Sequence, residues 1–474
     1  MPSLFILVPL LLIVILNLPM KRLRGNIALF TALVLCIVQS LLSLIYLLFK
    51  SVHFDPVVPF FTFALSIDRL TLILLCTIGI VSFASLLVAH STIVNPRQKF
   101  IFINLLLIAL IGMNTIVLVT DLFSLYVFIE ITAVASFVLI AIDKDLHAIE
   151  GTFKYLMLSS VATVFMLSSI AFFILVAGGT SFSDVHNSFS GTSDNPFTKI
   201  AAGLFLCGLL IKSGLVPFHG WLPDAYSAAP GPVSVLLAGI VTKITGIYTL
   251  LRLSTSVFVL NESMQNMLMF IGALSIVLAA LAAVTQSDFK RMLAYSSISQ
   301  VGYIALALGC ATPLALAGAV FHFFNHAIAK SLLFVNAASL EKRFATTDMN
   351  KLRSFGAKPL VTSVTSLIGF LSAAGMPPLA GFWSKLIIVI ALFSAGKTIY
   401  ASVALLATIL TLTYFLSLQT KVFFCKAQTV QPTVSSLPAI AVAEIILAAI
   451  AVLIGVCFPF VAYIWFLPLK EILH

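Results

Sequence analysis

The feature that most constrains this chain is a series of apolar stretches that fills almost the whole sequence. A helix of about 20 apolar residues crosses the hydrocarbon core of a bilayer. We expect fourteen such spans, at approximately 2–20, 26–49, 67–90, 99–119, 122–142, 151–178, 198–224, 232–253, 265–284, 290–309, 314–340, 360–396, 399–423 and 434–467. Since 61% of the residues are hydrophobic and only 9% are charged, a water-soluble core cannot account for them. The chain is therefore predicted to be an all-α, multi-pass integral membrane protein.

Little of the sequence remains for anything outside the membrane. The longest polar connections, SFSDVHNSFSGTSDNPF and EKRFATTDMNKLRSFGAKP, are too short to fold as domains. The first span lacks a small-residue cleavage site and leads into MKRLRG, so we expect a retained helix rather than a signal peptide. The six cysteines lie singly, without CxxC spacing, which predicts packing residues rather than ligands of zinc, iron–sulfur clusters or haem.

The basic residues predict how the spans are oriented. Connections after odd-numbered spans carry Lys21, Arg22, Arg24, Arg97, Lys99, Lys144, Lys154, Lys290, Arg291, Lys342, Arg343, Lys351, Arg353, Lys358, Lys421 and Lys426. Connections on the other side carry only Lys50, Arg69, Lys199, Arg252, Lys397 and Lys470. By the positive-inside rule, the odd-numbered connections are cytoplasmic, and both termini lie on the non-cytoplasmic side of the cell membrane. The net charge of +10 then reflects membrane orientation, and no nucleic-acid partner is expected.

Two spans share a motif that interrupts a helix. GLVPFHG at 214–220 and GMPPLAG at 375–381 place Gly, Pro and Gly at identical spacing, so helices 7 and 12 are predicted to be broken copies of each other. Asp121 and Asp288 match at a similar offset of five spans. Because five is odd, successive copies enter the membrane from opposite sides, which makes an inverted repeat. The expected parts are an N-terminal three-helix segment at 1–97, a first five-helix repeat at 98–258 (helices 4–8), a second, inverted repeat at 259–425 (helices 9–13) and helix 14 at 426–474.

Glu130 lies near the middle of the fifth span and is, from the sequence, the only carboxylate expected deep in any helix. A buried carboxylate without a partner takes up a proton instead of staying charged. Lys212, just before the first break, is the expected partner, and the free carbonyls of a helix end should also favour its charge. A lysine held in this way can switch between charged and neutral states and so hand on a proton. The structural alternatives are a neutral Glu130 hydrogen-bonded to a neighbouring helix and a Lys212 that extends toward the membrane surface.

The eighth and eleventh spans carry four more ionisable residues. Lys243 lies about a dozen residues into the eighth span, and His322, His326 and Lys330 form a stripe at i, i+4 and i+8 on one face of the eleventh. Histidines exchange protons near neutral pH, so this stripe could relay protons through intervening water. HFFNH has the spacing of a zinc helix but lacks the catalytic glutamate and an evident third ligand, so no metal is expected. Hydrogen bonds between helices remain the structural alternative.

Further ionisable and helix-breaking residues lie at the two breaks. Lys385 follows the second break at the position that Asp224 holds after the first, which suggests the far end of a proton pathway. His219 and Asp224, with Pro217 and Pro378 in the breaks themselves, are candidates for access or gating. Because intramembrane ionisable groups are functional by default, the candidate proton-transfer residues are Glu130, Lys212, Lys243, His322, His326, Lys330 and Lys385.

Several blocks of the sequence resemble one family of membrane proteins. They are Glu130 in the fifth span, IKSGLVPFHGWLPDAYSAAPGPVS with Lys212, Lys243 in the next helix, SDFKRMLAYSSISQVGY at 287–303, FHFFNHAIAKSLLF at 321–334 and GMPPLAGFWSK at 375–385. They are similar to the antiporter-like, proton-pumping membrane subunits of respiratory complex I, membrane-bound hydrogenases, formate hydrogenlyases and Mrp-type sodium/proton antiporters. The resemblance covers nearly the whole chain and implies fourteen helices, two inverted five-helix units and an array of such subunits side by side.

The resemblance also implies roles for the ionisable residues. It makes Glu130 and Lys212 an interacting pair, and Lys385 the terminal lysine of a second half-channel. The central hydrophilic axis would comprise Lys243, His326 and Lys330, with His322 contributing. Two departures limit the match: we expect no long lateral helix after the last span, because the chain ends at His474, and the twelfth helix carries lysine where one branch of the family has glutamate.

These features favour an ion-translocating subunit over other classes of protein. An enzyme that handles electrons itself is not expected, because the sequence shows no cofactor ligands and no glycine-rich nucleotide loop; iron–sulfur, flavin or nickel–iron centres would belong to partner subunits. A stand-alone transporter should offer groups shaped for its solute, and a scaffold would not need buried lysines. The predicted function is proton translocation in a multi-subunit redox-driven pump, such as complex I or a membrane-bound hydrogenase, with other membrane subunits, including further antiporter-like ones, as partners. The alternative is a subunit of an Mrp-type Na⁺/H⁺ antiporter driven by ion gradients.

Overall fold

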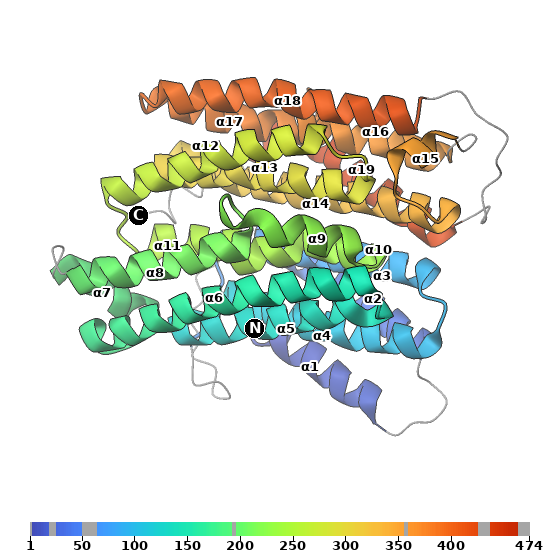
Figure 1. Ribbon diagram of the computed structural model, residues 1–474. Helices are drawn as coiled ribbons and strands as arrows, with labels where there is room; N and C mark the ends of the chain where they lie inside the picture. Colours follow the sequence, from blue (N-terminus) through green and yellow to red (C-terminus); the bar gives the residue numbers. More distant parts are fainter. Residues whose placement is uncertain are drawn as a thin grey trace.

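The computed structural model describes residues 2–18, 25–49, 64–191, 196–354, 359–424 and 437–462, and its helices lie side by side in one bundle (Figure 1). In chain order they are α1 (Leu4–Asn17), α2 (Asn26–Phe49), α3 (Arg69–Thr92), α4 (Pro96–Leu118), α5 (Leu122–Ile140), α6 (Leu146–Ala177), α7 (Phe182–Gly191), α8 (Pro196–Ser213), α9 (Trp221–Ala228), α10 (Gly231–Leu236), α11 (Thr249–Ser256), α12 (Glu262–Val284), α13 (Phe289–Cys310), α14 (Pro313–Phe344), α15 (Met349–Ser354), α16 (Leu360–Ala374), α17 (Ala380–Ser394), α18 (Thr398–Val422), α19 (Pro438–Val456) and α20 (Phe458–Val461). Short 3₁₀ turns occupy Ala141–Asp143 and Phe218–Gly220, and two π-helical stretches, Leu237–Val241 and Lys243–Tyr248, join α10 to α11.

The described residues form the expected set of membrane spans. Twelve helices are long and apolar enough to cross a bilayer, with α8 and α9 counted as one interrupted span and α10 to α11 as another. The shorter apolar helices α16 and α17 correspond to the second interrupted span, and α1, also a shorter apolar helix, corresponds to the predicted first span. The fourteen-helix, all-α prediction is therefore confirmed. The predicted last span, 434–467, corresponds to α19 and α20, and its ends lie outside the described residues, as do Lys21, Arg22, Arg24, Lys50, Lys358, Lys426 and Lys470.

Most of the long helices begin at a polar side chain that caps the first turn. Asp68, Asp121 and Asp288 each accept a hydrogen bond from the backbone N–H three residues further along the chain. Such caps satisfy donors that would otherwise be unpaired at a helix start. The interruptions have a different local cause. Gly214 and Gly375 adopt the left-handed conformation, with φ of +66° and +84°, that ends a helix before the following proline.

The inverted repeat is visible in two matching hydrogen-bond motifs. Asp121 pairs with Ser181 at the start of α5, and Leu122 N donates to Thr180 O at 2.8 Å. In the second copy Asp288 pairs with Asp348 at the start of α13, and Phe289 N donates to Thr347 O at 2.9 Å. The first motif leads into α7 and the second into α15, which lie at opposite ends of the bundle (Figure 1). The repeat boundaries at 98–258 and 259–425 stay a prediction.

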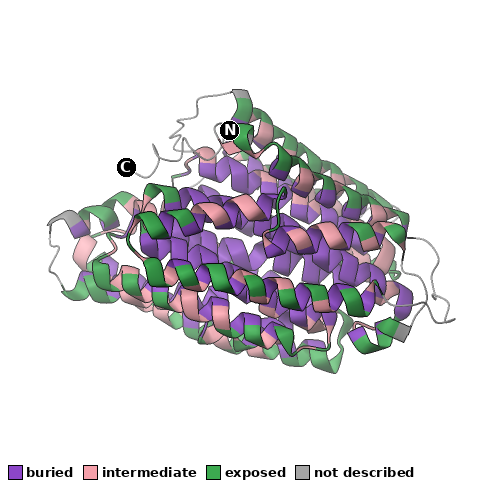
Figure 2. Cartoon of the chain, turned by 90° about the horizontal axis from the view of Figure 1, so that it is seen from above, coloured by how far each residue is buried: buried purple, intermediate pink, exposed green. Residues whose placement is uncertain are grey.

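The core of the bundle runs along the length of the helices, and exposed residues lie on its outer helices (Figure 2). Helix α14 packs against α3, α13, α16, α17 and α19, so that its residues from Ala315 to Leu340 are buried. Large apolar side chains such as Leu175 and Leu406 are exposed on the outer helices. An apolar outer face suits lipid, and the polar residues of α14 must then find partners within the protein.

Candidate functional site

Glu130 and Lys212 form an ion pair between α5 and α8. Lys212 Nζ lies 2.8 Å from Glu130 Oε1 and donates to Ser159 Oγ on α6 at 2.5 Å. Thr163, one turn further along α6, donates to the same Glu130 oxygen at 2.8 Å. The lysine side chain is 1% exposed and the glutamate side chain 24% exposed. The predicted partnership is therefore confirmed, and its two members differ strongly in their access to the surroundings.

The helix-end contacts predicted for Lys212 belong instead to Lys385. Lys212 lies in the last turn of α8, but its ammonium group points to Glu130 and Ser159. Lys385, on α17, donates to the carbonyls of Ala373 and Ala374 at 2.9 and 3.3 Å. Those carbonyls end α16 at the second break, where unpaired C=O groups favour a cation. The two breaks thus hold their lysines by different means.

Lys243 is buried in a stretch where the helix is wound more loosely. It begins the second π-helical stretch, and its Nζ donates to the carbonyl of Ala238, five residues earlier. Tyr226 packs beside this stretch, with its hydroxyl 2.5 Å from Thr242 Oγ1 and 3.2 Å from Leu237 O. π-Helical turns shift the pattern of backbone hydrogen bonds and often mark functional sites. The sequence predicted an ordinary helix here, because no residue type signals a π-turn.

The stripe on α14 is buried along its whole length. The rings of His322 and His326 are stacked, with centroids 6.2 Å apart and planes 3° apart. His322 Nδ1 lies 2.9 Å from Ser384 Oγ, whereas neither ring nitrogen of His326 has a hydrogen-bond partner among the described residues. Lys330 Nζ donates to Leu293 O at 3.1 Å and to Ser296 Oγ at 2.7 Å.

His326 is the centre of this group. It lies close enough to Lys243, His322, Lys330 and Lys385 to interact electrostatically with all four. Lys385 Nζ also lies 4.9 Å from the ring centroid of Tyr303, which is itself next to His322. Within the described part of the chain, Lys212 bonds to Glu130 and Ser159 and not to Lys243. The structure therefore brings five candidates together as a central cluster and leaves the Glu130–Lys212 pair beside it.

The candidate access residues lie near the two breaks but not inside the central cluster. Asp224, on α9, pairs with Lys154 of α6 at 2.7 Å and with Arg291 of α13 at 2.5 Å. The His219 ring lies 6.5 Å from that of Tyr295. Pro217 follows Val216, whose N–H donates to Ser275 Oγ at 3.0 Å, and the Pro378 carbonyl packs against Gly455. Asp224 thus connects the two predicted repeats, and Pro378 lies against the last span.

The prediction that Glu130 is the only deep carboxylate was wrong, because Glu444 is buried in α19. Thr362 of α16 donates to both oxygens of Glu444, at 2.9 and 3.1 Å, and its hydroxyl lies 3.2 Å from Ser339 of α14. A charged residue amid PAIAVAEIILAAIAV was the available signal. It was missed because a single glutamate seven residues into a span does not reveal whether it faces lipid or protein.

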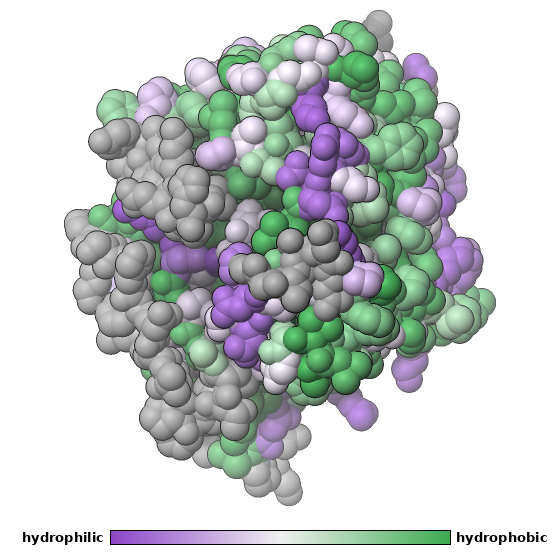
Figure 3. All heavy atoms as spheres, turned by 90° about the vertical axis from the view of Figure 1, so that its left-hand side faces the viewer, coloured by the Kyte–Doolittle hydropathy of each residue, from purple (hydrophilic) through white to green (hydrophobic). Residues whose placement is uncertain are grey.

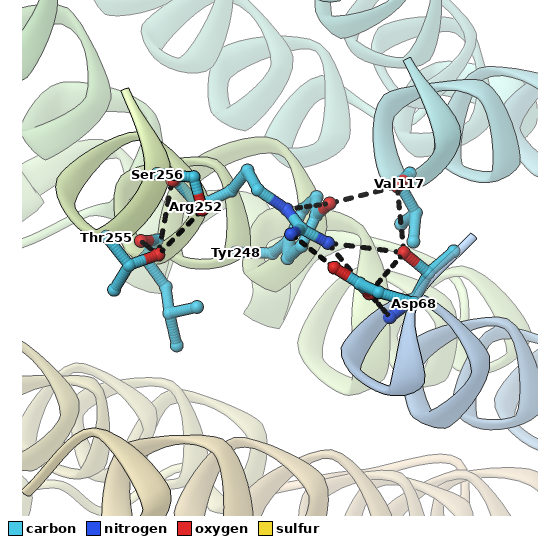
Figure 4. A network of polar contacts seen from close by, with 8 residues as sticks. Asp68, Val117, Tyr248, Arg252, Thr255 and Ser256 are labelled. Atoms are coloured by element: carbon cyan, nitrogen blue, oxygen red, sulfur yellow. Dashed lines mark hydrogen bonds and ion pairs between the residues drawn. The ribbon is translucent and has the colours of Figure 1, made fainter. Parts of the chain in front are cut away.

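Two basic residues assigned to connections are also buried. Lys290, at the start of α13, is 1% exposed and lies 2.6 Å from Glu341 Oε2. Arg252, on α11, contacts Asp68 with two guanidinium nitrogens at 2.5 and 3.0 Å, and its Nε donates to Tyr248 at 3.0 Å (Figure 4).

Asp68 precedes the α3 span. Burial raises the pKa of its carboxyl, but the charge and hydrogen bonds of Arg252 outweigh burial and hold this pKa below its usual value.

The arrangement can hold and pass protons within the membrane. Apart from the partly exposed Glu130, its members are buried titratable side chains next to hydroxyls that can both donate and accept. Within the described ranges, His, Cys, Asp and Glu side chains do not gather in groups of three that could hold a metal ion.

Comparison with known proteins shows which family the chain belongs to. The family model described as NADH:quinone oxidoreductase/Mrp antiporter, TM, matches residues 119–411. The chain is 32% identical to a Na(+)/H(+) antiporter subunit of Alkalihalophilus pseudofirmus over 353 residues, which cover 74% of this chain and 71% of that protein. It is 33% identical to an NADH-quinone oxidoreductase subunit of Desulforudis audaxviator over 323 residues, which cover 68% and 64% of the two proteins.

A solved structure extends the likeness to nearly the whole fold. It is that of the membrane-bound sulfane sulfur reductase, an archaeal respiratory membrane complex; one of its chains superimposes with a TM-score of 0.87 at 28% identity, covering 98% of this chain and 96% of that one. The chain belongs to the NADH:quinone oxidoreductase/Mrp antiporter family of membrane subunits.

Proposed function

We propose that this chain is a proton-translocating subunit of a multi-subunit, redox-driven membrane pump. The observation that carries the proposal is the buried cluster of Lys243, His322, His326, Lys330 and Lys385 on α14 and the helices around it. Ionisable groups this deep in a membrane protein are costly, and where they occur they mark ion or proton pathways. Electrons would be handled by partner subunits that carry iron–sulfur, flavin or nickel–iron centres. Other antiporter-like membrane subunits would lie beside this one.

The Glu130–Lys212 pair would act as the switch of the pump. Movement of the carboxylate away from Lys212 changes the charge next to the central cluster, and the shift in potential favours proton release from Lys243. The interaction energy of two close charges in a poorly polarisable interior can reach several kcal/mol. Moving one charge against 100 mV requires ~2.3 kcal/mol. The interaction energy is therefore large enough to drive the transfer. In this scheme Lys385 is the far end of the pathway, and the elements of access or gating are His219, Asp224, Pro217 and Pro378.

The positive-inside rule supports an orientation for this pump in the cell membrane. The end of the bundle with Lys144, Arg291 and Lys342 would face the cytoplasm, and both termini would lie on the other side. We refer to this end as the basic end.

A gradient-driven Na⁺/H⁺ antiporter subunit is the second candidate function. It is favoured by the 32% identity to a Na(+)/H(+) antiporter subunit, which nearly equals the 33% identity to a subunit of an NADH-quinone oxidoreductase. Purification of the tagged chain in mild detergent with its native partners distinguishes the two. Iron–sulfur or nickel-containing subunits would support the redox pump, whereas small hydrophobic subunits alone would support the antiporter.

Both candidates require proton movement through the same side chains. We expect Lys243→Met to lower proton transport in membrane vesicles about tenfold or more, since positioned proton-transfer groups contribute 10²–10⁴ to rates. Lys351→Met, an exposed lysine on α15, is the matched control and should keep the wild-type rate. Normal transport by the assembled Lys243→Met complex would contradict the proposed function.

A further inference from the structure

A pocket of about 500 Å³ opens at the basic end of the bundle. Its lining comes from the α3–α4 connection, the turn after α5, the start of α10 and the end of α14, and it includes Asp143, Glu341 and Lys342. Glu341 is 39% exposed and therefore meets water in the pocket. None of these residues belongs to the central cluster.

Lys290 lies behind Glu341 and is closed off from water. Its Nζ is 2.6 Å from Glu341 Oε2 and donates to the carbonyl of Ala229 at 3.0 Å. The lysine side chain is 1% exposed. The pair thus joins a carboxylate in the pocket to an amine that faces inward. Both groups can gain and lose a proton.

Hydroxyl groups continue from Ala229 toward Lys243. Ser234 Oγ donates to the carbonyls of Ala229 and Tyr226, each at 3.0 Å. The Tyr226 hydroxyl is 2.5 Å from that of Thr242, the residue before Lys243. Hydroxyls both donate and accept, so with bridging water they can carry a proton between Lys290 and Lys243.

The helix that carries Lys243 has different polar residues toward its other end, at Arg252. Beyond Lys243 the buried polar residues are Thr245, Tyr248, Thr249 and Arg252, and the Arg252 guanidinium is bound by the Asp68 carboxylate (Figure 4). A second pocket, of about 370 Å³, lies there and is lined by Arg252, His186 and Thr120 among others. Hydrophilic surface gathers toward the middle of this face of the molecule (Figure 3). An arginine keeps its proton in proteins, so this end does not offer the relay found at the other.

We propose that Glu341 and Lys290 form the port through which Lys243 exchanges protons with water at the basic end. Lys290 releases its proton inward along Ser234, Tyr226 and Thr242, which leaves a neutral amine beside the Glu341 carboxylate. The carboxylate then takes a proton from water in the pocket and passes it to the amine, so that the pair ends with its original charges. This inference rests on the proposed function, in which Lys243 is a proton carrier.

Lys290→Arg is the decisive variant, because arginine keeps the ion pair with Glu341 but cannot release its proton. In vesicles containing the whole complex, we expect Lys290→Arg to lower proton transport about tenfold or more. Its co-purification with partner subunits and its thermal midpoint should stay at the wild-type values, which a purely structural role could not explain. Glu341→Gln should also slow transport. Lys342 lines the same pocket but is not part of the relay, so the transport rate of Lys342→Met should stay within about twofold of the wild-type rate.

The outcomes separate this proposal from the general one. If Lys243→Met stops transport while Lys290→Arg and Glu341→Gln run at the wild-type rate, the port is overturned and the proposed function stands. If Lys243→Met transports normally, the proposed function itself fails. Should Lys290→Arg not assemble, the rate of Glu341→Gln decides: a wild-type rate overturns the port, and a loss of about tenfold supports it.

Discussion

Gly246, in the second π-helical stretch, lies directly against Ser213, the residue after Lys212. A Cβ at position 246 would come 2.5 Å from Ser213 Oγ and 2.7 Å from its Cα and N. The helix that carries Lys243 and the helix end that carries Lys212 are thus in close backbone contact. This contact is the described link between the ion pair and the central cluster.

We expect Gly246→Ala to disturb both lysines. The added methyl group forces the two backbones apart, and such overpacking costs about 1–3 kcal/mol. Gly203→Ala is the control, since a Cβ there meets nothing within 4 Å and alanine favours a helix. Thermal midpoints and proton transport of the purified complex check this. Equal behaviour of the two variants would show that the contact is not tight.

Removing Glu130 should destabilise the protein more than removing Lys212. Glu130→Gln leaves a buried ammonium with Ser159 and without a countercharge, which costs about 3–5 kcal/mol. Lys212→Met leaves a carboxylate that is partly exposed and still accepts from Thr163, so a smaller loss is expected. The double variant should be less destabilised than the sum of the two. Thermal unfolding of all three variants gives the comparison.

The same variants test the switch. Glu130→Gln should slow proton transport even where the complex assembles, because the change in charge beside Lys212 is lost. Full pumping by this variant would rule out the proposed coupling. Glu150→Gln, an exposed carboxylate on α6, serves as the control.

The Asp68–Arg252 pair should make stability depend on acidity. Because the pKa of Asp68 is held below its usual value of about 4, the pair stabilises the protein above that pH and loses its effect as the pH falls through the lowered pKa. Asp68→Asn should reduce the thermal midpoint at pH 7, and its difference from the wild type should shrink in acid. A difference independent of pH would contradict this assignment. Arg252→Lys should also destabilise, since lysine cannot contact both carboxylate oxygens in the same way.

Glu444 is expected to matter mainly through its hydrogen bonds. Glu444→Gln keeps an acceptor for the Thr362 hydroxyl and should preserve assembly. Glu444→Leu leaves Thr362 without this partner and should cost about 1–3 kcal/mol. The exposed Glu262→Gln on α12 is the control, with a change within ~0.5 kcal/mol. If Glu444→Gln were as destabilised as Glu444→Leu, a charged carboxylate would be required instead.

The sequence by itself determined the membrane fold of this protein. Apolar runs of bilayer length predicted the spans, and the repeated Gly–Pro–Gly motif predicted both interruptions, because glycine and proline act on the backbone locally. The Glu130–Lys212 pair could also be predicted, since a lone buried charge needs a partner and the chain offered few. The sequence could not predict which lysine would bind helix-end carbonyls, because the contact between Lys385 and Ala373 depends on how the break between α16 and α17 is folded.

Only the tertiary structure decided where the remaining charges lie. Arg252 and Lys290 were expected in connections, yet their partners Asp68 and Glu341 are far away in the sequence and draw both side chains inside. Glu444 is buried because α14 and α16 cover it, and the π-helical turns around Lys243 follow from packing against Tyr226 and Ser213. Periodicity places a residue on a helix, whereas the neighbouring helices decide whether that position faces lipid, water or another charge.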